Sequence, residues 1–365
     1  MVRGKSVPLR QQTSRQAVCN RPADERQTTK VVKPQGRCRP RGFLVKTMSD
    51  ITEGKINGNS LIINKNGGGQ NSLPTLEEAY SRCSSQLKSK LEHSVDLLRK
   101  AEKLALIYNP QDGFFNTFSG GKDSQAMYHV LQLAGVKFKT YFSPTTVDPP
   151  EVIRFIKKHY PDVVFIRPKK SMYTLAVEKG LLPSMTVRYC CAEYKENTGA
   201  GQCTTIGIRS SESSRRSKRH EVEITDKKFS GDLNGLDKYR EEFAQSKKGR
   251  KAERSADGMV KCINGKESLL ISPIFDWTDK DVWEFLNDVV KVPHCKLYDQ
   301  GRTRIGCVMC PMSSYKNKLK DIAEYPHVKH RWIKAIMDIR RGGVSQLTDT
   351  QRITTNKFYE KQKWL

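Results

Sequence analysis

The stretch FNTFSGGKDS, residues 115–124, decides the fold of this chain. Its apolar part predicts a short strand over 114–118, and the residues behind the glycines predict a helix over 124–133. Glycines let a backbone approach a ligand closely, and the N–H groups and dipole of a helix N-terminus favour an anion. Two serines and an aspartate in the turn suit a nucleotide with its metal ion. The stretch therefore predicts a phosphate-binding turn.

The spacing of this turn excludes two common nucleotide-binding loops. A Walker A loop has four residues between its first glycine and Gly-Lys, and a dinucleotide-binding loop follows G-x-G-x-x-G. Residues 119–124, SGGKDS, fit neither pattern. The turn instead resembles the pyrophosphate-binding loop of the adenine-nucleotide alpha-hydrolase-like family. The alternative is a glycine turn that binds no ligand.

Strand and helix signals alternate after the turn. Strands are predicted over 138–142, 163–166 and 204–208, with a helix over 150–159 between the first two. This alternation is typical of an α/β fold, which we expect to be a doubly wound and mostly parallel sheet with helices on both faces. Ligands of such sheets bind at the carboxyl ends of the strands, where the turn and residues 145–148 (TTVD) would lie.

Further elements are predicted on either side of this unit. Thr75 and Glu78 form a capping-box pattern, and apolar residues at helical spacing continue to about Ile107. They predict a helix that packs on the core rather than in a coiled coil. The remaining predictions are a core strand over 269–274 and helices over 276–286 and 326–339.

Composition divides the chain into three parts. Residues 1–72 predict a disordered basic tail and linker, and Met48 is an alternative start. Residues 73–330 predict the α/β domain, and 331–365 a basic C-terminal extension. Within the domain, the basic residues 210–266 predict an insertion with little core of its own, either a mobile flap or a hairpin.

The charge balance favours polyanionic partners. The 365 residues include 65 Lys and Arg against 39 Asp and Glu, a formal net charge of +26. Nucleotides, nucleic acid (through the tail and the insertion) or an acidic protein would suit this charge, and a lysine-rich surface with a basic tail is the plainer explanation. With no run of 18 apolar residues and no secretory leader pattern, we expect a cytoplasmic protein without a membrane span.

The ten cysteines are expected to be ligands or buried thiols rather than disulfides. Two pairs stand out, Cys190-Cys191 and the C-x-x-C of Cys307 and Cys310. Soft thiolates suit zinc or an iron–sulfur cluster. Because the side chains of adjacent cysteines diverge, they suit a cubane cluster, in which each thiolate binds a different iron, better than one tetrahedral zinc. Four reduced buried cysteines are the structural alternative.

The order of these motifs carries a resemblance to a known family. SGGKDS is followed by R-x-C-C-x-x-x-K from Arg188, by G-x-R-x-x-E-S from Gly207, and by C-x-x-C-P from Cys307. Together, over about residues 110–315, they resemble the phosphoadenosine phosphosulfate (PAPS) reductase family, whose fold is doubly wound α/β. The adenylyl-sulfate reductase branch binds a 4Fe–4S cluster through Cys-Cys and Cys-x-x-Cys. The resemblance implies the same role for Cys190, Cys191, Cys307 and Cys310, and the basic insertion explains their long separation.

Two departures from the reductases shift the expected activity. No cysteine follows Cys310, so the tail thiol with which assimilatory reductases attack the sulfonucleotide is missing. The intact SGGKDS loop is typical of family members that split ATP between the α and β phosphates. Both features favour an ATP-using relative, similar to the small subunit of ATP sulfurylase or to the sulfurtransferase of DNA phosphorothioation.

Roles follow for the residues of the turn. We expect Ser119, Gly120, Gly121 and Ser124 to hold phosphate through backbone N–H and hydroxyl groups. Lys122 would neutralise charge, although a middle residue of the turn can also face solvent. Asp123 would cap the helix or hold Mg²⁺, with Asp148 a weaker candidate for the metal. Lys122, Asp123 and Arg209 are the predicted catalytic residues.

Arginines beyond the turn are the expected anion ligands. Arg209, with Arg215 or Arg216, would contact phosphate or sulfate oxygens, to which a bidentate guanidinium is suited. For Arg215 and Arg216 a solvated surface position is the alternative. Arg188 and Arg304 would bind substrate or balance the charge of a cluster. Glu212 would hold one of the arginines.

The expected function is cleavage of ATP to AMP and pyrophosphate in a sulfur-transfer or adenylation reaction. Its cofactors would be ATP, Mg²⁺ and a 4Fe–4S cluster, with zinc as the alternative metal, and its partner a sulfur-donor protein. One alternative is a reductase of PAPS or adenylyl sulfate that uses an external thiol. A second is a non-catalytic regulator that binds nucleic acid.

Overall fold

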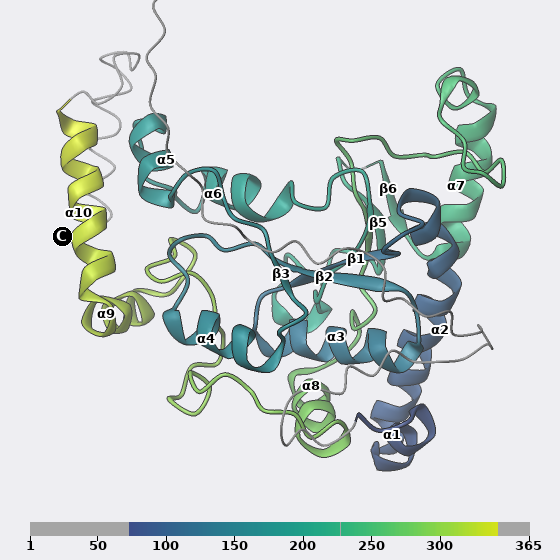
Figure 1. Cartoon of the computed structure of the whole chain (residues 1–365), viewed down its shortest axis with the longest axis horizontal. Coiled ribbons are helices and arrows are strands. Elements are labelled where there is room, and N and C mark those ends of the chain that lie inside the picture. The colour runs from purple at the N-terminus through teal and green to yellow at the C-terminus, as the bar shows by residue number, and fades with distance from the viewer. Residues whose placement is uncertain (1–72, 227, 342–365) are drawn as a thin grey trace, which may run out of the picture. The chain divides into compact units, whose positions relative to one another are not determined.

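A computed structural model describes residues 73–226 and 228–341 of the chain (Figure 1). These residues belong to one compact unit, Gly67–Leu365. The predicted tail and linker over 1–72, the alternative start at Met48, and the part of the predicted extension beyond residue 341 lie outside the described residues. The expected domain boundary at residue 330 falls inside a helix, Pro326–Arg340.

The described residues form a seven-stranded sheet in the order β3-β2-β1-β4-β7-β5-β6. The strands are β1 Phe114–Phe118, β2 Phe138–Phe142, β3 Val164–Phe165, β4 Cys203–Thr205, β5 Val222–Ile224, β6 Phe229–Gly231 and β7 Leu269–Ile271. The first five strands in spatial order are parallel, while β5 runs antiparallel to β7, and β6 antiparallel to β5. The predicted α/β fold with a mostly parallel sheet is confirmed.

The chain changes direction across the sheet at β1. It leaves β1 for β2 and β3 on one side and then returns to β4 on the other. The turn after β1 therefore lies at a switch point of the sheet, and folds of this class bind their ligands at the carboxyl ends of strands at such a point. Buried Asn116 joins the neighbouring strands β2, β1 and β4, because its amide donates to Thr140 Oγ1 (3.0 Å) and accepts from Thr205 Oγ1 (3.1 Å).

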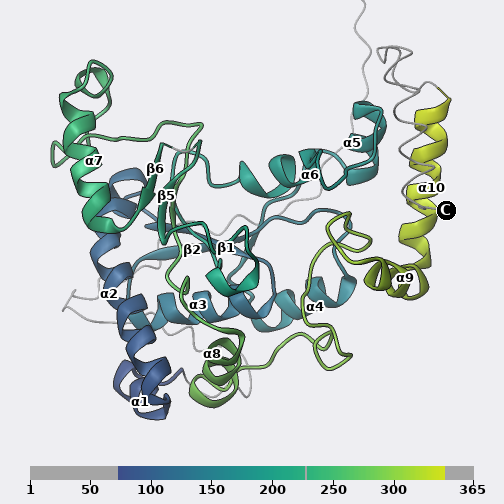
Figure 2. The ribbon, with the colours of Figure 1, turned by 180° about the vertical axis from the view of Figure 1, so that it is seen from behind.

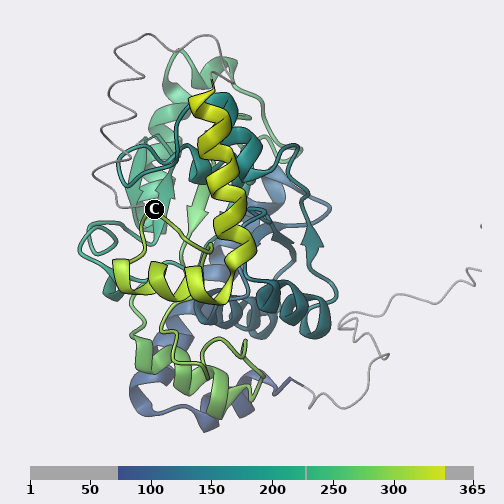
Figure 3. The same cartoon turned by 90° about the vertical axis from the view of Figure 1, so that its left-hand side faces the viewer.

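Helices pack around the sheet as the doubly wound fold requires. They include α3 Lys122–Ala134, α4 Pro150–His159, α5 Met172–Lys179, α6 Tyr189–Cys191, α7 Leu233–Gln245, α8 Asp279–Glu284, α9 Tyr315–Glu324 and α10 Pro326–Arg340. In Figures 1 and 2, α3 and α4 lie below the strands, whereas α5 and α6 lie above them. The last helix, α10, packs with α5 in a separate hydrophobic cluster, and it faces the viewer in yellow in Figure 3.

The single helix expected before the sheet is two helices, α1 Leu76–Arg82 and α2 Ser85–Tyr108. The capping box of Thr75 and Glu78 is present. Cys83 is extended, and the Ser84 side chain accepts from the N–H of Leu87 to start the second helix. The break keeps the apolar spacing nearly in phase, so periodicity alone did not reveal it.

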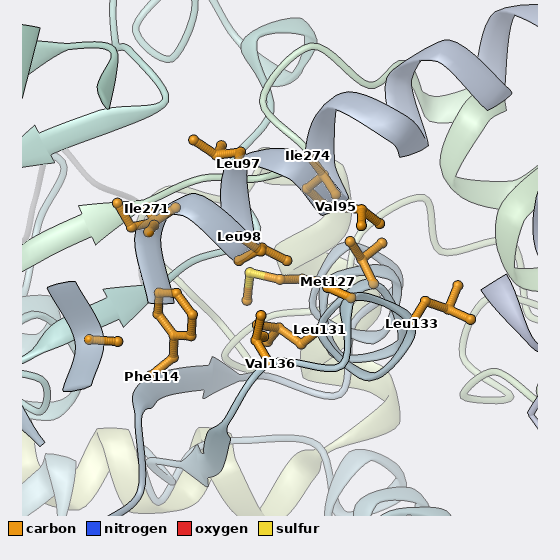
Figure 4. Close-up of a cluster of buried hydrophobic side chains, with 14 of the residues drawn as sticks. Val95, Leu97, Leu98, Phe114, Met127, Leu131, Leu133, Val136, Ile271 and Ile274 are labelled. Atoms are coloured by element: carbon orange, nitrogen blue, oxygen red, sulfur yellow. The ribbon is translucent and has the colours of Figure 1, made fainter. Parts of the chain in front are cut away.

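The main core lies between α2, α3 and the strands, as Figure 4 shows. The labelled side chains are Val95, Leu97, Leu98, Phe114, Met127, Leu131, Leu133, Val136, Ile271 and Ile274. The apolar face of α2 is therefore buried in the core, as predicted, and β1 and α3 are held rigidly on either side of the glycine turn.

The basic insertion takes more part in the fold than expected. Its β5–β6 hairpin extends the sheet beyond β7, and Val222, Ile224 and Leu236 are buried in the main core. The expectation of little core was wrong, because a three-residue strand among charged residues gives too short an apolar pattern to recognise. The hairpin alternative agrees with the structure.

Downstream boundaries also differ from the predictions. The helix expected over 276–286 begins at Asp279 behind a Thr278 cap and continues as a π-helical turn, Phe285–Val289. Helices α5 and α9 were not predicted, because short amphipathic segments between loops resemble the loops themselves in composition.

Candidate nucleotide loop and cysteine pocket

The turn 119–124 joins β1 to α3 in a conformation that its residues require. Gly120 has φ +70°, and a Cβ there would lie 2.9 Å from Val152 Cγ1. The Ser124 hydroxyl donates to the carbonyl of Gly121 (2.8 Å) and accepts from the N–H of Ser119 (3.2 Å). The turn is thus braced by its own side chains. The N-cap residue of α3 is Gly121, which has no side chain with which to cap the helix.

Tyr298 contacts the start of α3 and was not predicted. Its hydroxyl accepts from the N–H of Lys122 (2.8 Å), and its ring packs edge-on against Trp283 with centroids 5.0 Å apart. Burial raises the pKa of this phenol, which therefore stays protonated at neutral pH. Tyr298 lies 176 positions from Lys122, and no motif points to it.

The predicted catalytic residues come together in one charged network. Arg209, 2% exposed, donates through Nε to Asp123 Oδ1 (2.7 Å) and through a terminal nitrogen to Asp279 Oδ1 (2.7 Å). Lys122 Nζ lies 3.2 Å from Asp279 Oδ1 and 3.6 Å from Asp123 Oδ2. Asp279, at the start of α8, is the member that sequence reasoning missed.

The network fixes orientations that the sequence left open. The Lys122 side chain is 5% exposed, so the solvent-facing alternative is wrong. Asp123 lies inside the first turn of α3 and pairs with Arg209, and it does not cap the helix. Burial raises the pKa of Asp279, but Lys122 and Arg209 outweigh burial and hold that pKa below its usual range.

Close packing of two loops produces this network. A Cβ on Gly207 would lie 2.9 Å from the carbonyl oxygen of Asp123, so only glycine lets the loop after β4 approach the start of α3. Arg209 follows two residues later and gives a further hydrogen bond to Ser211 Oγ (3.0 Å). Its donors meet protein acceptors, so direct contact of Arg209 with phosphate stays a prediction.

The other predicted anion ligands differ in their exposure to solvent. Glu212 forms an ion pair with Arg216, as expected of a residue that holds an arginine. Burial lowers the pKa of Arg216, and the charge of Arg304 lowers it further while Asp123 raises it. The charges of Arg304 and Asp123 therefore both act on Arg216, whereas Arg215 is exposed.

The four paired cysteines line one small pocket. Cys190 and Cys191 belong to α6, and Cys307 and Cys310 to the turn that precedes α9. Their common pocket lies beside the loop after β2, because the N–H of Val308 donates to the carbonyl of Val147 (2.8 Å). In this loop the Asp148 carboxylate accepts from the N–H of Thr145 (2.5 Å), and its proposed metal role stays a prediction.

Asp321 of α9 holds the C-x-x-C turn. Met309, between the two cysteines, has φ +56°, an uncommon conformation for a residue with a side chain. Its N–H donates to Asp321 Oδ2 (2.7 Å), and Arg302 donates to the other oxygen (2.8 Å). Because α9 was not predicted, this buried carboxylate was not found from the sequence.

A model of the phosphoadenosine phosphosulfate reductase domain matches residues 114–313. The chain belongs to this family. The match runs from β1 to just beyond the C-x-x-C turn, so it includes the nucleotide loop and all four paired cysteines.

Individual relatives of this PAPS reductase family protein are distant. An uncharacterised protein of Methanocaldococcus jannaschii is 26% identical over 264 residues, which are 71% of this chain and 56% of that protein. The chain thus spans about half the length of that relative.

Solved structures are similar to it only at low TM-scores. An FMN adenylyltransferase of Candida glabrata in complex with FAD and inorganic pyrophosphate is 15% identical at a TM-score of 0.39, over 64% of this chain and 71% of that one. A U34-tRNA thiolase of Methanococcus maripaludis with its 4Fe–4S cluster is 12% identical at a TM-score of 0.32, over 70% and 79%.

Positively charged side chains lie near the thiols of the cysteine pocket. A hydrogen bond from Cys190 and another from Arg188 (3.3 Å) lower the pKa of Cys191 to about 5. Conversely, Cys307 raises the pKa of the neighbouring Lys195. Arg188 therefore contacts Cys191, as expected of an arginine beside the cysteines, whereas the expected role of Arg304 stays a prediction. This environment suits a bound group of net negative charge.

The donor set fits a multi-iron cluster better than one ion. Among residues 73–226 and 228–341, no three His, Cys, Asp or Glu side chains are arranged to share one metal ion, and the choice between zinc and a cluster stays a prediction. Thiolates on different irons of a cluster stand farther apart, and Arg188 Nε is buried with no acceptor. A Mg²⁺ held by one carboxylate and nucleotide phosphates needs no such group of three.

The remaining cysteines lie elsewhere in the fold. The eight described cysteines are free thiols. Cys295, the nearest in sequence to the C-x-x-C, is buried in a different hydrophobic cluster. In the part of the chain that the structure describes, no helix is long and apolar enough to span a bilayer.

Proposed function

We propose that the protein binds ATP at the turn 119–124 and cleaves it between the α and β phosphates. The observation that carries the proposal is the position of the turn, at the switch point between β1 and β4 and at the N-terminus of the 13-residue helix α3. The first N–H groups of a helix have no acceptor within the helix itself, and its dipole presents a positive end to an anion. Family membership supports the same ligand class.

In the proposed step, a nucleophile on the acceptor attacks the α-phosphorus of ATP. A new bond to phosphorus forms, the bond to the bridging oxygen breaks, and pyrophosphate leaves with that electron pair. Backbone N–H groups of the turn, together with Arg216 and Arg304, would stabilise the charge on the phosphates. Arg209 would act through Asp123, which it orients toward a Mg²⁺ ion, and Lys122 would balance the charge of both carboxylates.

The cysteine pocket would serve the acceptor side of the reaction. Cys190, Cys191, Cys307 and Cys310 would hold a 4Fe–4S cluster, which supplies electron transfer or a site for sulfur when bound. Arg188 and Lys195 would balance its charge. A sulfur-donor protein would then be the partner, and the adenylated acceptor would receive the sulfur.

Pyrophosphate release from ATP with Mg²⁺ tests the proposed cleavage. We expect Asp123→Asn to lower the rate about 100-fold, because the variant weakens the hold on the Mg²⁺ ion that would balance the charge of the leaving pyrophosphate. The matched control is Asp112→Asn, whose carboxylate pairs with Lys139 (3.4 Å) before β1, at the opposite edge of the sheet. Equal rates in the two variants, or nucleotide binding with no turnover, would contradict the proposal.

Metal analysis tests the cluster separately. After anaerobic purification, we expect iron and sulfide, a brown visible spectrum, and loss of both in Cys307→Ser. A colourless protein that contains zinc would remove the cluster from the proposal and leave ATP cleavage standing.

A second candidate function is reduction of PAPS or adenylyl sulfate, favoured by the family's domain match. In that reaction an external thiol takes the sulfonate group, and a second thiol releases sulfite as the disulfide forms. Sulfite release with thioredoxin or glutathione, but no pyrophosphate from ATP, would select it.

A further inference from the structure

Trp332 of α10 lies in the wall of the cysteine pocket. It is 4% exposed and lines the pocket together with the four cysteines. On its other side, the ring of Tyr173 from α5 packs edge-on against the indole, with centroids 4.9 Å apart. The side chain is therefore held between two helices and has little freedom to turn away.

The indole N–H of Trp332 is buried without a partner. Among the described residues, no acceptor lies within hydrogen-bond reach of Nε1. The indole nitrogen only donates, and leaving such a buried donor unpaired costs about 1–3 kcal/mol. Another buried tryptophan, Trp277, shows the usual arrangement, because its Nε1 donates to Ser94 Oγ (3.1 Å).

A second donor beside the pocket is unpaired in the same way. Arg188 donates through a terminal nitrogen to Cys191 Sγ, but its buried Nε has no acceptor. Two orphaned donors at one set of thiols point to an acceptor that arrives with a bound group. The pocket lining includes Lys195, a further cation, so this acceptor is an anion or a soft sulfur atom.

We propose that Trp332 Nε1–H donates a hydrogen bond to a sulfur atom of the iron–sulfur group held by the four cysteines. Helix α10 is then part of the site, although it lies beyond the family match at residue 313. The inference rests on the cluster of the proposed function. An N–H donor to cluster sulfur stabilises the added electron, so Trp332 is a positioning residue that raises the reduction potential.

Trp332→Phe tests this, because it removes the N–H and keeps an aromatic ring against Tyr173. After anaerobic reconstitution with iron and sulfide, we expect the variant to hold as much iron as the wild type but to have a more negative midpoint potential. Trp277→Phe, the same change at a core tryptophan, should leave the potential unchanged. An unchanged potential in a loaded Trp332→Phe protein would overturn the inference and leave the proposed function intact.

A measurement on the unaltered protein covers the case in which Trp332→Phe does not fold. With ¹⁵N at the indole position of every tryptophan, the reduced cluster should show a ¹⁵N hyperfine coupling by pulsed electron paramagnetic resonance. A loaded wild-type protein without this coupling refutes the hydrogen bond. If the wild type takes up no iron, the proposed cluster and this inference fail together.

Discussion

His129 is a buried imidazole behind the nucleotide loop. It lies on α3, where Nδ1 contacts Gln132 Oε1 (2.9 Å) and Nε2 contacts Tyr160 Oη (3.1 Å). Burial lowers its pKa to about 4, and the hydrogen bond with Gln132 offsets only part of this. The folded protein therefore keeps His129 neutral at a pH where the unfolded chain protonates it.

This difference predicts a loss of stability in acid. Between pH 6.5 and about 4 the unfolded state binds the extra proton, so the free energy of unfolding falls as the pH falls through that window. From pH 7 to 4.5 the contribution of His129 is about 2–3 kcal/mol. Urea unfolding at the two pH values measures it. In His129→Gln the fall should be smaller by that amount, and an equal fall in both proteins would refute the assigned pKa.

Residues with a local pattern could be predicted from the sequence, and those reached through the fold could not. The turn 119–124 and the two cysteine pairs carry their chemistry in adjacent positions. Tyr298 and Asp279 reach the same loop from more than 150 positions away, and a lone tyrosine or aspartate has no distinguishing spacing. Their roles follow from packing, which one sequence without the fold does not contain.

The helix α9 holds the C-x-x-C turn in its conformation. Its Asp321 is buried and accepts from the N–H of Met309 and from Arg302. Arg302 also pairs with Glu324, one turn further along the helix. The left-handed Met309 is thus held by a single helix, and the positions of Cys307 and Cys310 depend on it.

Asp321→Asn should therefore loosen the cysteine turn. We expect a loss of about 2–4 kcal/mol in the free energy of unfolding, because a buried partner of Arg302 loses its charge. Cys307 and Cys310 should also react faster with a thiol reagent under native conditions. The control is Asp338→Asn on α10, which breaks an exposed pair with Lys334 and should cost under about 0.5 kcal/mol. Unchanged thiol reactivity in Asp321→Asn would contradict the assigned role of α9.

Elements with strong periodicity were predicted closely, whereas short ones were not. The strands β1 and β2 and the helix α4 have the expected bounds, because each is a clear apolar pattern between turn residues. The strand β5 is only three residues long and gains its stability from pairing with β7. Such a strand is formed by tertiary pairing, so no local signal announces it.

The whole fold could be anticipated because alternating strands and helices have few compact arrangements. The antiparallel edge was not predicted, because the sequence does not show that the β5–β6 hairpin lies beside β7. Part of the basic insertion is therefore anchored to the sheet, so some of its basic residues are carried by folded structure.

The net charge of +26 belongs to the molecule as a whole and favours a polyanionic partner such as nucleic acid. If the protein binds nucleic acid through six to ten phosphate contacts, affinity should fall about 10³–10⁵-fold between 50 and 200 mM salt, because each contact releases counterions. Fluorescence anisotropy of a labelled DNA across this range measures the slope.

Mg²⁺-ATP should not displace the DNA if the basic surface and the nucleotide loop are separate sites. Absence of binding at 50 mM salt would contradict the regulator alternative, and displacement by ATP would mean that DNA binds at the loop. DNA binding together with pyrophosphate release would instead identify nucleic acid as a candidate acceptor, because the positive charge would then bind the substrate of the reaction.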